Sequence, residues 1–308
     1  MVSSPSHHMK GFSGVIVPMI TPFNEDLSVD EEALRWLVSF LSEKGVDGIF
    51  VNSTTGEFVH LRRDEMLGIV RISLDVAEGP KILPGISSNY TEDAISLGRE
   101  MKDLGVDGAV VMPPYFFKLK EDWLLHHFSR IANSLDLPLI IYNIPSLTGN
   151  DIPVSVYVRL AEEFSNVVGA KVTKDSISYM RNLVVRVKSV RPDFSVLTGM
   201  DDHLLNTLAL GGDGGIMALA NVAPEIHLSI HRSWVSGDLK GAVEGFRKLA
   251  SLARIYDFAS SFPTAIKTAL SILGTPVKEV CRPPLMVESA EVRTKIREIL
   301  EEVGVSIE

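Results

Sequence analysis

The sequence contains one cysteine, no long apolar run and no cluster of basic residues, and each shortage excludes a class of protein. The single thiol, Cys281, rules out a disulfide framework and a cysteine-based zinc site within the chain. No stretch approaches the roughly 20 consecutive apolar residues of a transmembrane helix. Residues 1–10 are rich in Ser, Pro and His and lack the apolar core of a signal peptide. We therefore expect a cytoplasmic protein that is not embedded in a membrane.

Acidic residues outnumber basic ones, 39 to 30, and give a formal net charge of -9. An anionic surface of this kind repels nucleic acids and anionic membranes, so we expect neither as a partner. Hydrophobic residues make up 45% of the chain and charged residues 22%, the balance of a soluble globular protein with a large core. The length of 308 residues suits one large α/β barrel or two ordinary domains.

Short apolar segments alternate with helix-like segments eight times along the chain. The predicted strands are residues 13–20, 48–52, 81–86, 108–112, 138–142, 167–173, 194–198 and 214–219. The predicted helices that follow them are residues 29–44, 62–77, 91–105, 121–135, 153–164, 176–190 and 202–210, and one that begins at 224. Eight such units predict a (β/α)8 TIM barrel over residues 11–235. Helices at 238–257, 263–273 and 290–303 predict a C-terminal helical extension, residues 236–308, packed on the barrel.

A doubly wound sheet is the competing architecture for this alternation. In its dinucleotide-binding form, a Gly-rich G-x-G-x-x-G turn follows the first strand. Here Gly11 and Gly14 precede the apolar part of that strand, and no such motif follows it. We therefore favour the barrel.

The sixth predicted strand carries a lysine, Lys171, among apolar neighbours. A strand of a parallel sheet is usually buried on both faces, and burying an ammonium group is costly unless the group is paired or loses its proton. A partly neutral lysine is a nucleophile that can attack a ketone and form a Schiff base. The alternative is a lysine at a strand end that extends to solvent or pairs with a carboxylate.

Two polar motifs follow other strands, at the end where the active site of a (β/α)8 barrel lies. Thr54, Thr55 and Gly56 follow the second strand. Their small hydroxyls and backbone N–H groups suit a carboxylate, although such turns are also ordinary loop chemistry. Tyr142 ends the fifth strand and can act as a general acid or base, or be only an aromatic side chain at the rim.

Asp201, Asp202 and His203 follow the seventh strand. Their carboxylates can hold the hydroxyls of a sugar, or one of them can cap the helix that begins there. The same three residues could suggest a metal site, but adjacent residues on one turn rarely supply all the ligands. We therefore predict no metal.

Three motifs in this order resemble the family of N-acetylneuraminate lyase and dihydrodipicolinate synthase. They are Thr-Thr-Gly-Glu at 54–57, Tyr-Asn-Ile-Pro at 142–145 and Gly-Ala-Lys at 169–171. The resemblance covers the chain from Gly14 to the C-terminal helices. It implies a class I lyase that handles pyruvate through a Schiff base on a (β/α)8 barrel and needs no cofactor. It also implies a homotetramer, with the loop at Tyr115 and Phe116 as a candidate interface.

The resemblance also implies roles for single residues. Lys171 is similar to the Schiff-base lysine, and Tyr142 to the proton-transfer tyrosine. Thr54 and Thr55 are similar to the pair that holds the pyruvyl carboxylate and joins the tyrosine in a proton relay. Lys174 has no counterpart and is expected at the surface. The expected catalytic residues are Lys171, Tyr142 and Thr54, and the expected substrate-binding residues are Thr55, Gly56, Gly199, Asp201, Asp202 and Tyr115.

Three positions depart from the patterns of particular branches of this family. Leu147 stands where the synthase branch carries an arginine for the carboxylate of its second substrate, and a leucine cannot form that bidentate pair. Phe116 replaces a tyrosine that reaches into a neighbouring subunit, and Ala218 replaces a serine frequent in sialate lyases. The run from Gly199 to Thr207 is most similar to 2-keto-3-deoxygluconate aldolases.

We therefore expect a class I aldolase that cleaves 2-keto-3-deoxygluconate reversibly to pyruvate and glyceraldehyde. A sialate lyase, a dehydratase of a keto-deoxy sugar acid and a dihydrodipicolinate synthase with an unusual second site are alternatives with the same chemistry. A non-catalytic pyruvate-binding protein is the alternative from another class. A phosphate-binding barrel enzyme is disfavoured, because Asp201-Asp202 and Ala220-Asn221 stand where its phosphate loops would be.

Overall fold

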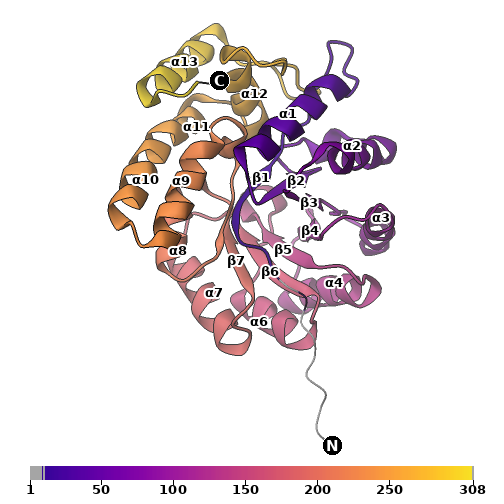
Figure 1. Ribbon diagram of the computed structural model, residues 1–308. Coiled ribbons are helices and arrows are strands. Elements are labelled where there is room, and N and C mark those ends of the chain that lie inside the picture. The colour runs from indigo at the N-terminus through magenta and orange to yellow at the C-terminus, as the bar shows by residue number, and fades with distance from the viewer. Residues whose placement is uncertain (1–8, 10, 307–308) are drawn as a thin grey trace, which may run out of the picture. The chain divides into compact units, whose positions relative to one another are not determined.

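The computed structural model describes residue 9 and residues 11–306 (Figure 1). The predicted absence of a signal peptide concerns residues 1–10, which apart from Met9 lie outside the described residues. Eight strands alternate with helices and form one sheet in the order β3-β2-β1-β8-β7-β6-β5-β4. Neighbouring strands whose register is resolved run parallel. The predicted (β/α)8 barrel is confirmed.

Each strand is a short apolar segment. The strands are β1 (Gly14–Pro18), β2 (Gly48–Val51), β3 (Lys81–Pro84), β4 (Ala109–Val111), β5 (Leu139–Asn143), β6 (Val167–Val172), β7 (Ser195–Thr198) and β8 (Gly214–Ile216). All their residues are buried except Lys81. Burial on both faces explains why the sequence shows continuous apolar runs instead of alternation. Some predicted strands are too long because the apolar pattern continues past the ladder, as at residues 217–219.

The helices follow the predicted pattern with three differences. They are α1 (Glu31–Lys44), α2 (Arg63–Val76), α3 (Thr91–Asp103), α4 (Glu121–Ser134), α5 (Pro145–Thr148), α6 (Val154–Glu163), α7 (Ile177–Val190), α8 (Leu204–Ala209), α9 (Pro224–Ser236), α10 (Leu239–Ala253), α11 (Ile255–Phe258), α12 (Phe262–Ile272) and α13 (Ala290–Val303), with short turns η1 (Phe58–His60), η2 (Asp201–His203) and η3 (Ala218–Asn221). The predicted helix 202–210 is divided into η2 and α8, and 238–257 into α10 and α11. The four-residue α5 has no predicted counterpart. None of the helices in the described part of the chain is long and apolar enough to cross a membrane.

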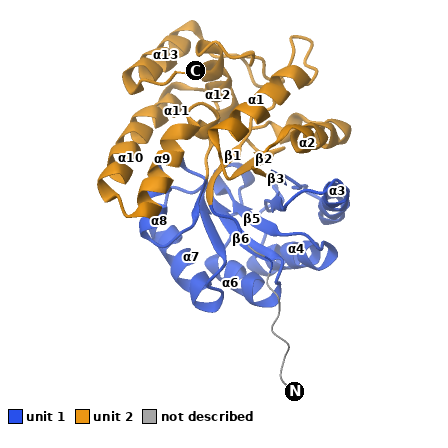
Figure 2. Cartoon of the chain, in the orientation of Figure 1, with its two compact units in different colours: residues 1–13, 83–215 blue, residues 14–82, 216–308 orange. Residues whose placement is uncertain are grey.

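The chain divides into two compact units (Figure 2). Unit 1 comprises residues 1–13 and 83–215 and contains β4 to β7. In this unit β5 pairs with β4 and β6, and β6 also pairs with β7. Tyr142 of β5 is in register with Lys171 of β6. Neighbouring strands therefore place these two side chains at the same level of the sheet.

Unit 2 comprises residues 14–82 and 216–308. Here β1 pairs with β2, and α1 packs against α2. The C-terminal helices belong to the same unit, in which α9 packs against α10, and α13 packs against α10, α11 and α12. From residue 237 to residue 306 the structure contains helices and loops but no strand, as predicted. The domain boundary expected at 235/236 falls at the end of α9 and stays a prediction.

Candidate active site

Lys171 lies near the C-terminal end of β6 and is buried, with 3% of its surface exposed. Its Nζ atom lies 4.0 Å from the centroid of the Tyr142 ring. Burial lowers the pKa of Lys171 from 10.5 to about 7, and the nearby Asp201 carboxylate opposes part of this shift. Low-dielectric surroundings disfavour the ammonium form, so much of the amine is neutral near pH 7. The neutral amine has the lone pair that attacks a ketone.

The Tyr142 hydroxyl accepts a hydrogen bond of 3.1 Å from the Thr173 hydroxyl. Tyr142 is itself buried, with 2% of its surface exposed. The hydrogen bond from Thr173 holds the phenol oxygen in a fixed position. Thr173 is a site residue that sequence analysis missed. Its position two residues after Lys171 was the available signal, because an extended chain turns such residues to the same face.

Gly199 follows β7, and its N–H donates to the Val172 carbonyl at 2.7 Å. A Cβ atom at this position would overlap the Thr173 hydroxyl and lie 3.0 Å from Lys171 Cε. Any other residue would therefore push against the lysine and its neighbour. The predicted site residue Gly199 lies beside Lys171, and the space that Thr173 and Lys171 occupy explains why glycine stands there.

The two aspartates of η2 differ in their surroundings. Asp201 is buried, and its charge acts on Lys171, whereas Asp202 is exposed. His203 directly precedes α8, which has no side-chain cap, so the interpretation of an aspartate as its N-cap is wrong. His203 Nε2 lies 3.2 Å from Asp175 Oδ1. Of the predicted residues in this region, Lys171 and Asp201 are brought together.

A polar network holds the end of β5 in place. The Asn143 amide donates to Asp151 at 2.9 Å and to the Tyr179 hydroxyl at 3.1 Å, and its oxygen accepts the Ile152 N–H. Lys174 forms an ion pair with Asp151, and 28% of its side chain is exposed. The expectation of a surface position for Lys174 is therefore only partly right, because the side chain is half-buried and paired.

In unit 2, residues Ser53–Gly56 form a tight turn after β2, here called the hydroxyl turn. The Gly56 N–H donates to the Ser53 hydroxyl at 2.9 Å, and the Gly56 carbonyl accepts from the Thr21 hydroxyl at 2.7 Å. A Cβ atom at Gly56 would lie 2.8 Å from the Met19 carbonyl oxygen. Thr55 is buried and Thr54 is half-buried. The hydroxyl turn is thus fixed on both sides of its two threonines.

Tyr115 lies elsewhere in unit 1, in the lining of a cavity of about 380 Å³. Its N–H donates to the Asn89 side chain at 2.7 Å. The adjoining Phe116 and Phe117 are 88% and 72% exposed, and Trp123 also lines the cavity. The structure therefore places Tyr115 in an aromatic surface loop.

A buried lysine with a lowered pKa, set against a tyrosine on neighbouring strands of a (β/α)8 barrel, is typical of carbon–carbon lyases that work through a Schiff base. The chain belongs to the dihydrodipicolinate synthetase family, whose sequence model matches residues 11–303. The predicted family and the predicted enzyme class, a lyase, are both confirmed.

Three relatives illustrate the similarity. A protein of Thermofilum pendens named "Uncharacterized DapA-like lyase" is 56% identical over 96% of this chain and 99% of its own length. In Escherichia coli K12, "Probable 2-dehydro-3-deoxy-D-pentonate aldolase YjhH" is 40% identical over 96% and 99% of the two chains. "Putative 2-dehydro-3-deoxy-D-gluconate aldolase YagE", also from E. coli K12, is 36% identical over 89% and 91%. The crystal structure of YagE in complex with pyruvate superposes with a TM-score of 0.93, at 34% identity, over 96% and 99% of the chains.

Proposed function

We propose that the protein is a cytoplasmic class I aldolase that cleaves 2-keto-3-deoxygluconate reversibly to pyruvate and glyceraldehyde. The observation that carries the proposal is the buried Lys171 amine, whose pKa is about 7, against the Tyr142 ring. Such an amine can attack a ketone near neutral pH without a cofactor. The names of YjhH and YagE, both aldolases of 2-dehydro-3-deoxy sugar acids, support this class of substrate.

In the proposed reaction, the Lys171 amine attacks C2 of the keto acid. The Tyr142 phenol donates its proton to the hydroxyl of the resulting carbinolamine, which leaves as water and gives an iminium ion and the Tyr142 phenolate. The Tyr142 phenolate takes the proton of the C4 hydroxyl, and the electrons of the C3–C4 bond move toward the iminium as that bond breaks. Glyceraldehyde leaves, and the remaining enamine accepts the proton from Tyr142 at C3. Water then hydrolyses the iminium to pyruvate and the free amine, and the proton that is set free returns to Tyr142. The hydrogen bond from Thr173 to Tyr142 supports the tyrosine as the base.

The remaining residues bind and orient the substrate in this scheme. Thr55 and the backbone of Gly56 take the carboxylate, whose charge is unchanged through the reaction, and Thr54 assists proton transfer. The rigidity of the hydroxyl turn supports this role, because a fixed set of donors loses little entropy on binding. Asp201 and Asp202 orient the sugar hydroxyls, a contribution of binding and positioning.

A 2-keto-3-deoxypentonate is the second candidate substrate, which the similarity to YjhH favours. Cleavage by the same steps would release pyruvate and a two-carbon aldehyde. Dihydrodipicolinate synthesis has less support. Leu147, which stands where the synthase branch carries its arginine, is an exposed residue of α5 and cannot pair with a carboxylate.

We also propose a homotetramer, with the aromatic loop at Tyr115 in an interface. The exposure of Phe116, Phe117 and Trp123 supports this, because contiguous exposed aromatic surface often marks a contact between proteins. Light scattering gives the mass directly. Phe116→Asp should shift a tetramer toward smaller species, and a monomeric wild-type protein would refute the proposal.

A trapping experiment tests the aldolase. The protein is incubated with 2-keto-3-deoxygluconate, reduced with borohydride, weighed as an intact chain and digested to map the adduct. A three-carbon pyruvyl adduct on Lys171 would support cleavage. A six-carbon adduct would indicate that the Schiff base forms without cleavage, as in a dehydratase.

Two controls sharpen this test. Lys174→Ala removes the neighbouring lysine and should leave the adduct unchanged, whereas Lys171→Ala should abolish it. Repeating the reaction with 2-keto-3-deoxypentonate and identifying the released aldehyde separates the two substrates. If neither sugar acid nor pyruvate gives an adduct on Lys171, the proposal fails.

A further inference from the structure

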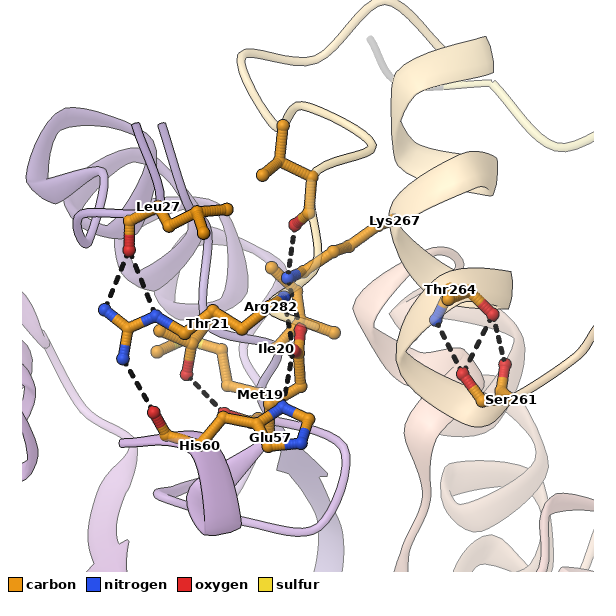
Figure 3. A network of polar contacts seen from close by, with 12 residues as sticks. Met19, Ile20, Thr21, Leu27, Glu57, His60, Ser261, Thr264, Lys267 and Arg282 are labelled. Atoms are coloured by element: carbon orange, nitrogen blue, oxygen red, sulfur yellow. Dashed lines mark hydrogen bonds and ion pairs between the residues drawn. The ribbon is translucent and has the colours of Figure 1, made fainter. Parts of the chain in front are cut away.

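A buried ion pair joins the C-terminal helices to the residue that follows the hydroxyl turn (Figure 3). Lys267 of α12 donates from Nζ to a Glu57 carboxylate oxygen at 2.5 Å, and neither side chain is exposed. The same Nζ donates to the Val280 carbonyl at 2.8 Å and lies 4.3 Å from the centroid of the Phe23 ring. Burying two charges is costly even when they pair, so stability alone is a weak explanation for this arrangement.

The second carboxylate oxygen of Glu57 also has polar partners. It accepts the Arg282 backbone N–H at 3.1 Å and lies 3.2 Å from His60 Nδ1. The Arg282 guanidinium donates to the His60 carbonyl at 2.7 Å and to Glu65 at 2.6 Å. Figure 3 shows Lys267 and Arg282 converging on the region of Glu57 and His60. The Glu57 carboxylate is therefore held by two separate stretches of the C-terminal segment.

The Glu57 backbone is held as firmly as its side chain. Its φ angle is 57°, a left-handed conformation that a non-glycine residue keeps only where its surroundings enforce it. The Glu57 N–H donates to the Thr54 carbonyl at 3.1 Å, and the next N–H, of Phe58, donates to the Ser53 carbonyl at 3.1 Å. The position of Glu57 therefore sets the geometry of the hydroxyl turn.

We propose that Glu57 and Lys267 are positioning residues that hold the hydroxyl turn in the geometry that binds the substrate carboxylate. The inference rests on the proposed function, which assigns the carboxylate to that turn. Glu57 acts through the turn backbone, and Lys267 acts through Glu57. The C-terminal helices thereby set the affinity for the keto acid, while Lys171 carries the covalent step.

The chain offers a matched control and a built-in probe. Lys278 also lies in the C-terminal segment, but it pairs at 2.8 Å with Asp30, the N-cap residue of α1, and its side chain is 46% exposed. The probe is Cys281, the only cysteine of the chain. Its thiol is buried, and burial raises its pKa to about 12. A loosened Glu57 region should make this thiol accessible to alkylation.

The test compares wild type with Lys267→Met, Glu57→Gln and the control Lys278→Met. Glu57→Gln keeps the shape of the side chain, so it serves if Lys267→Met fails to fold. Hydrogen exchange of residues 53–58 reports the turn, and alkylation of Cys281 reports the packing around Glu57 and Lys267. Borohydride trapping on Lys171 is measured against pyruvate concentration and, separately, with hydroxyacetone, a ketone that has no carboxylate.

The expected result separates carboxylate binding from the covalent step. Lys267→Met should raise the half-saturating pyruvate concentration about tenfold with little change in the maximal trapping rate, the signature of lost uniform binding. Glu57→Gln should do the same to a smaller extent. In both variants, residues 53–58 should exchange their amide hydrogens faster and Cys281 should be alkylated faster. The rate of trapping with hydroxyacetone should be unchanged in both. Lys278→Met should match wild type in all of these measurements.

Contrary results are equally specific. Unchanged exchange of residues 53–58 in the folded variants would overturn the inference, as would faster exchange with an unchanged pyruvate dependence. An equal loss of hydroxyacetone and pyruvate trapping would also overturn it, because a general structural defect would then explain both. If wild type traps neither ketone, the proposed function fails, and the assignment of a carboxylate-positioning role fails with it.

Discussion

Two buried lysines, one in each compact unit, differ in what surrounds them. Lys171 of β6 is 3% exposed and has a pKa lowered to about 7, with the Tyr142 ring 4.0 Å from its Nζ. Lys267 of α12 is 0% exposed, and its Nζ lies 2.5 Å from a Glu57 oxygen. Burial and an adjacent aromatic ring, Tyr142 or Phe23, are common to both, so the difference lies in the pKa of Lys171 and in the ion pair of Lys267. A buried amine with a lowered pKa can serve as a nucleophile, whereas one in a close ion pair with a carboxylate ties two segments together.

Removal of Lys171 and removal of Lys267 should therefore have different consequences. The largest effect should be the loss of catalysis when Lys171 is removed. We expect Lys171→Ala to lower kcat/KM at least ~10³-fold, because no other group supplies the covalent step. Steady-state release of pyruvate from the sugar acid measures this. Lys174→Ala, which removes a lysine three residues away, should stay near wild type. A Lys171→Ala enzyme with near wild-type turnover would contradict the assignment of the nucleophile.

The free energy of unfolding should fall when Lys267 is removed and not when Lys171 is removed. We expect Lys267→Met to lower the free energy of unfolding by about 3–5 kcal/mol, because Glu57 is left as a buried, unpaired charge. Urea unfolding followed by circular dichroism measures the change. The double variant Glu57→Gln/Lys267→Met should recover part of the loss, since both charges are then gone. Equal stability of Lys267→Met and wild type would show that the pair contributes nothing to the fold.

Lys171→Met should instead stabilise the protein, by up to about 5 kcal/mol at pH 6. The folded pKa of about 7 lies below the ordinary value of 10.5, so the unfolded chain binds the proton more tightly. The penalty is fully present below the folded pKa and disappears as pH rises toward 10.5. The gain from Lys171→Met should therefore be smaller at pH 9 than at pH 6. A gain independent of pH would contradict a lowered pKa.

The space around Lys171 provides a subtler perturbation. An added methyl at Gly199 would overlap the Thr173 hydroxyl and crowd Lys171 Cε. We expect Gly199→Ala to lower kcat by about 10²-fold, the cost of displacing a reacting group by roughly 1 Å. Gly68→Ala is a suitable control, because nothing lies within 4 Å of a Cβ at that position. Full activity in Gly199→Ala would show that the lysine has room to move.

The same two lysines show what the sequence could predict. Lys171 interrupts a continuous apolar strand, a local anomaly that points to a buried amine. Lys267 lies on a helix, where a lysine is ordinary, and its partner Glu57 is 210 positions away. Without the fold, no pattern in the sequence connects them. In the sequence, Glu57 could be identified only as the last residue of the Thr-Thr-Gly-Glu motif.

The barrel was predictable because eight apolar strands each leave a continuous local signal. Thr173 was missed although it stands two residues after Lys171, because a threonine at a strand end is common. Lys174 was expected at the surface, whereas it pairs with Asp151, a contact between two loops. The four residues of α5 leave no periodic signal. What escaped prediction is thus contact between segments, which depends on the tertiary fold.

The smallest expected effect concerns the electrostatic tuning of Lys171. Asp201 raises the pKa of Lys171 against the effect of burial, so Asp201→Asn should lower it below about 7. The rate of borohydride trapping with pyruvate rises with the fraction of neutral amine. Its midpoint against pH should therefore move to lower pH in Asp201→Asn and stay unchanged in Asp202→Asn, whose carboxylate is exposed. A midpoint that moves upward in Asp201→Asn would mean that burial and this aspartate do not set the nucleophile's pKa, and the contrast between the two lysines would need another cause.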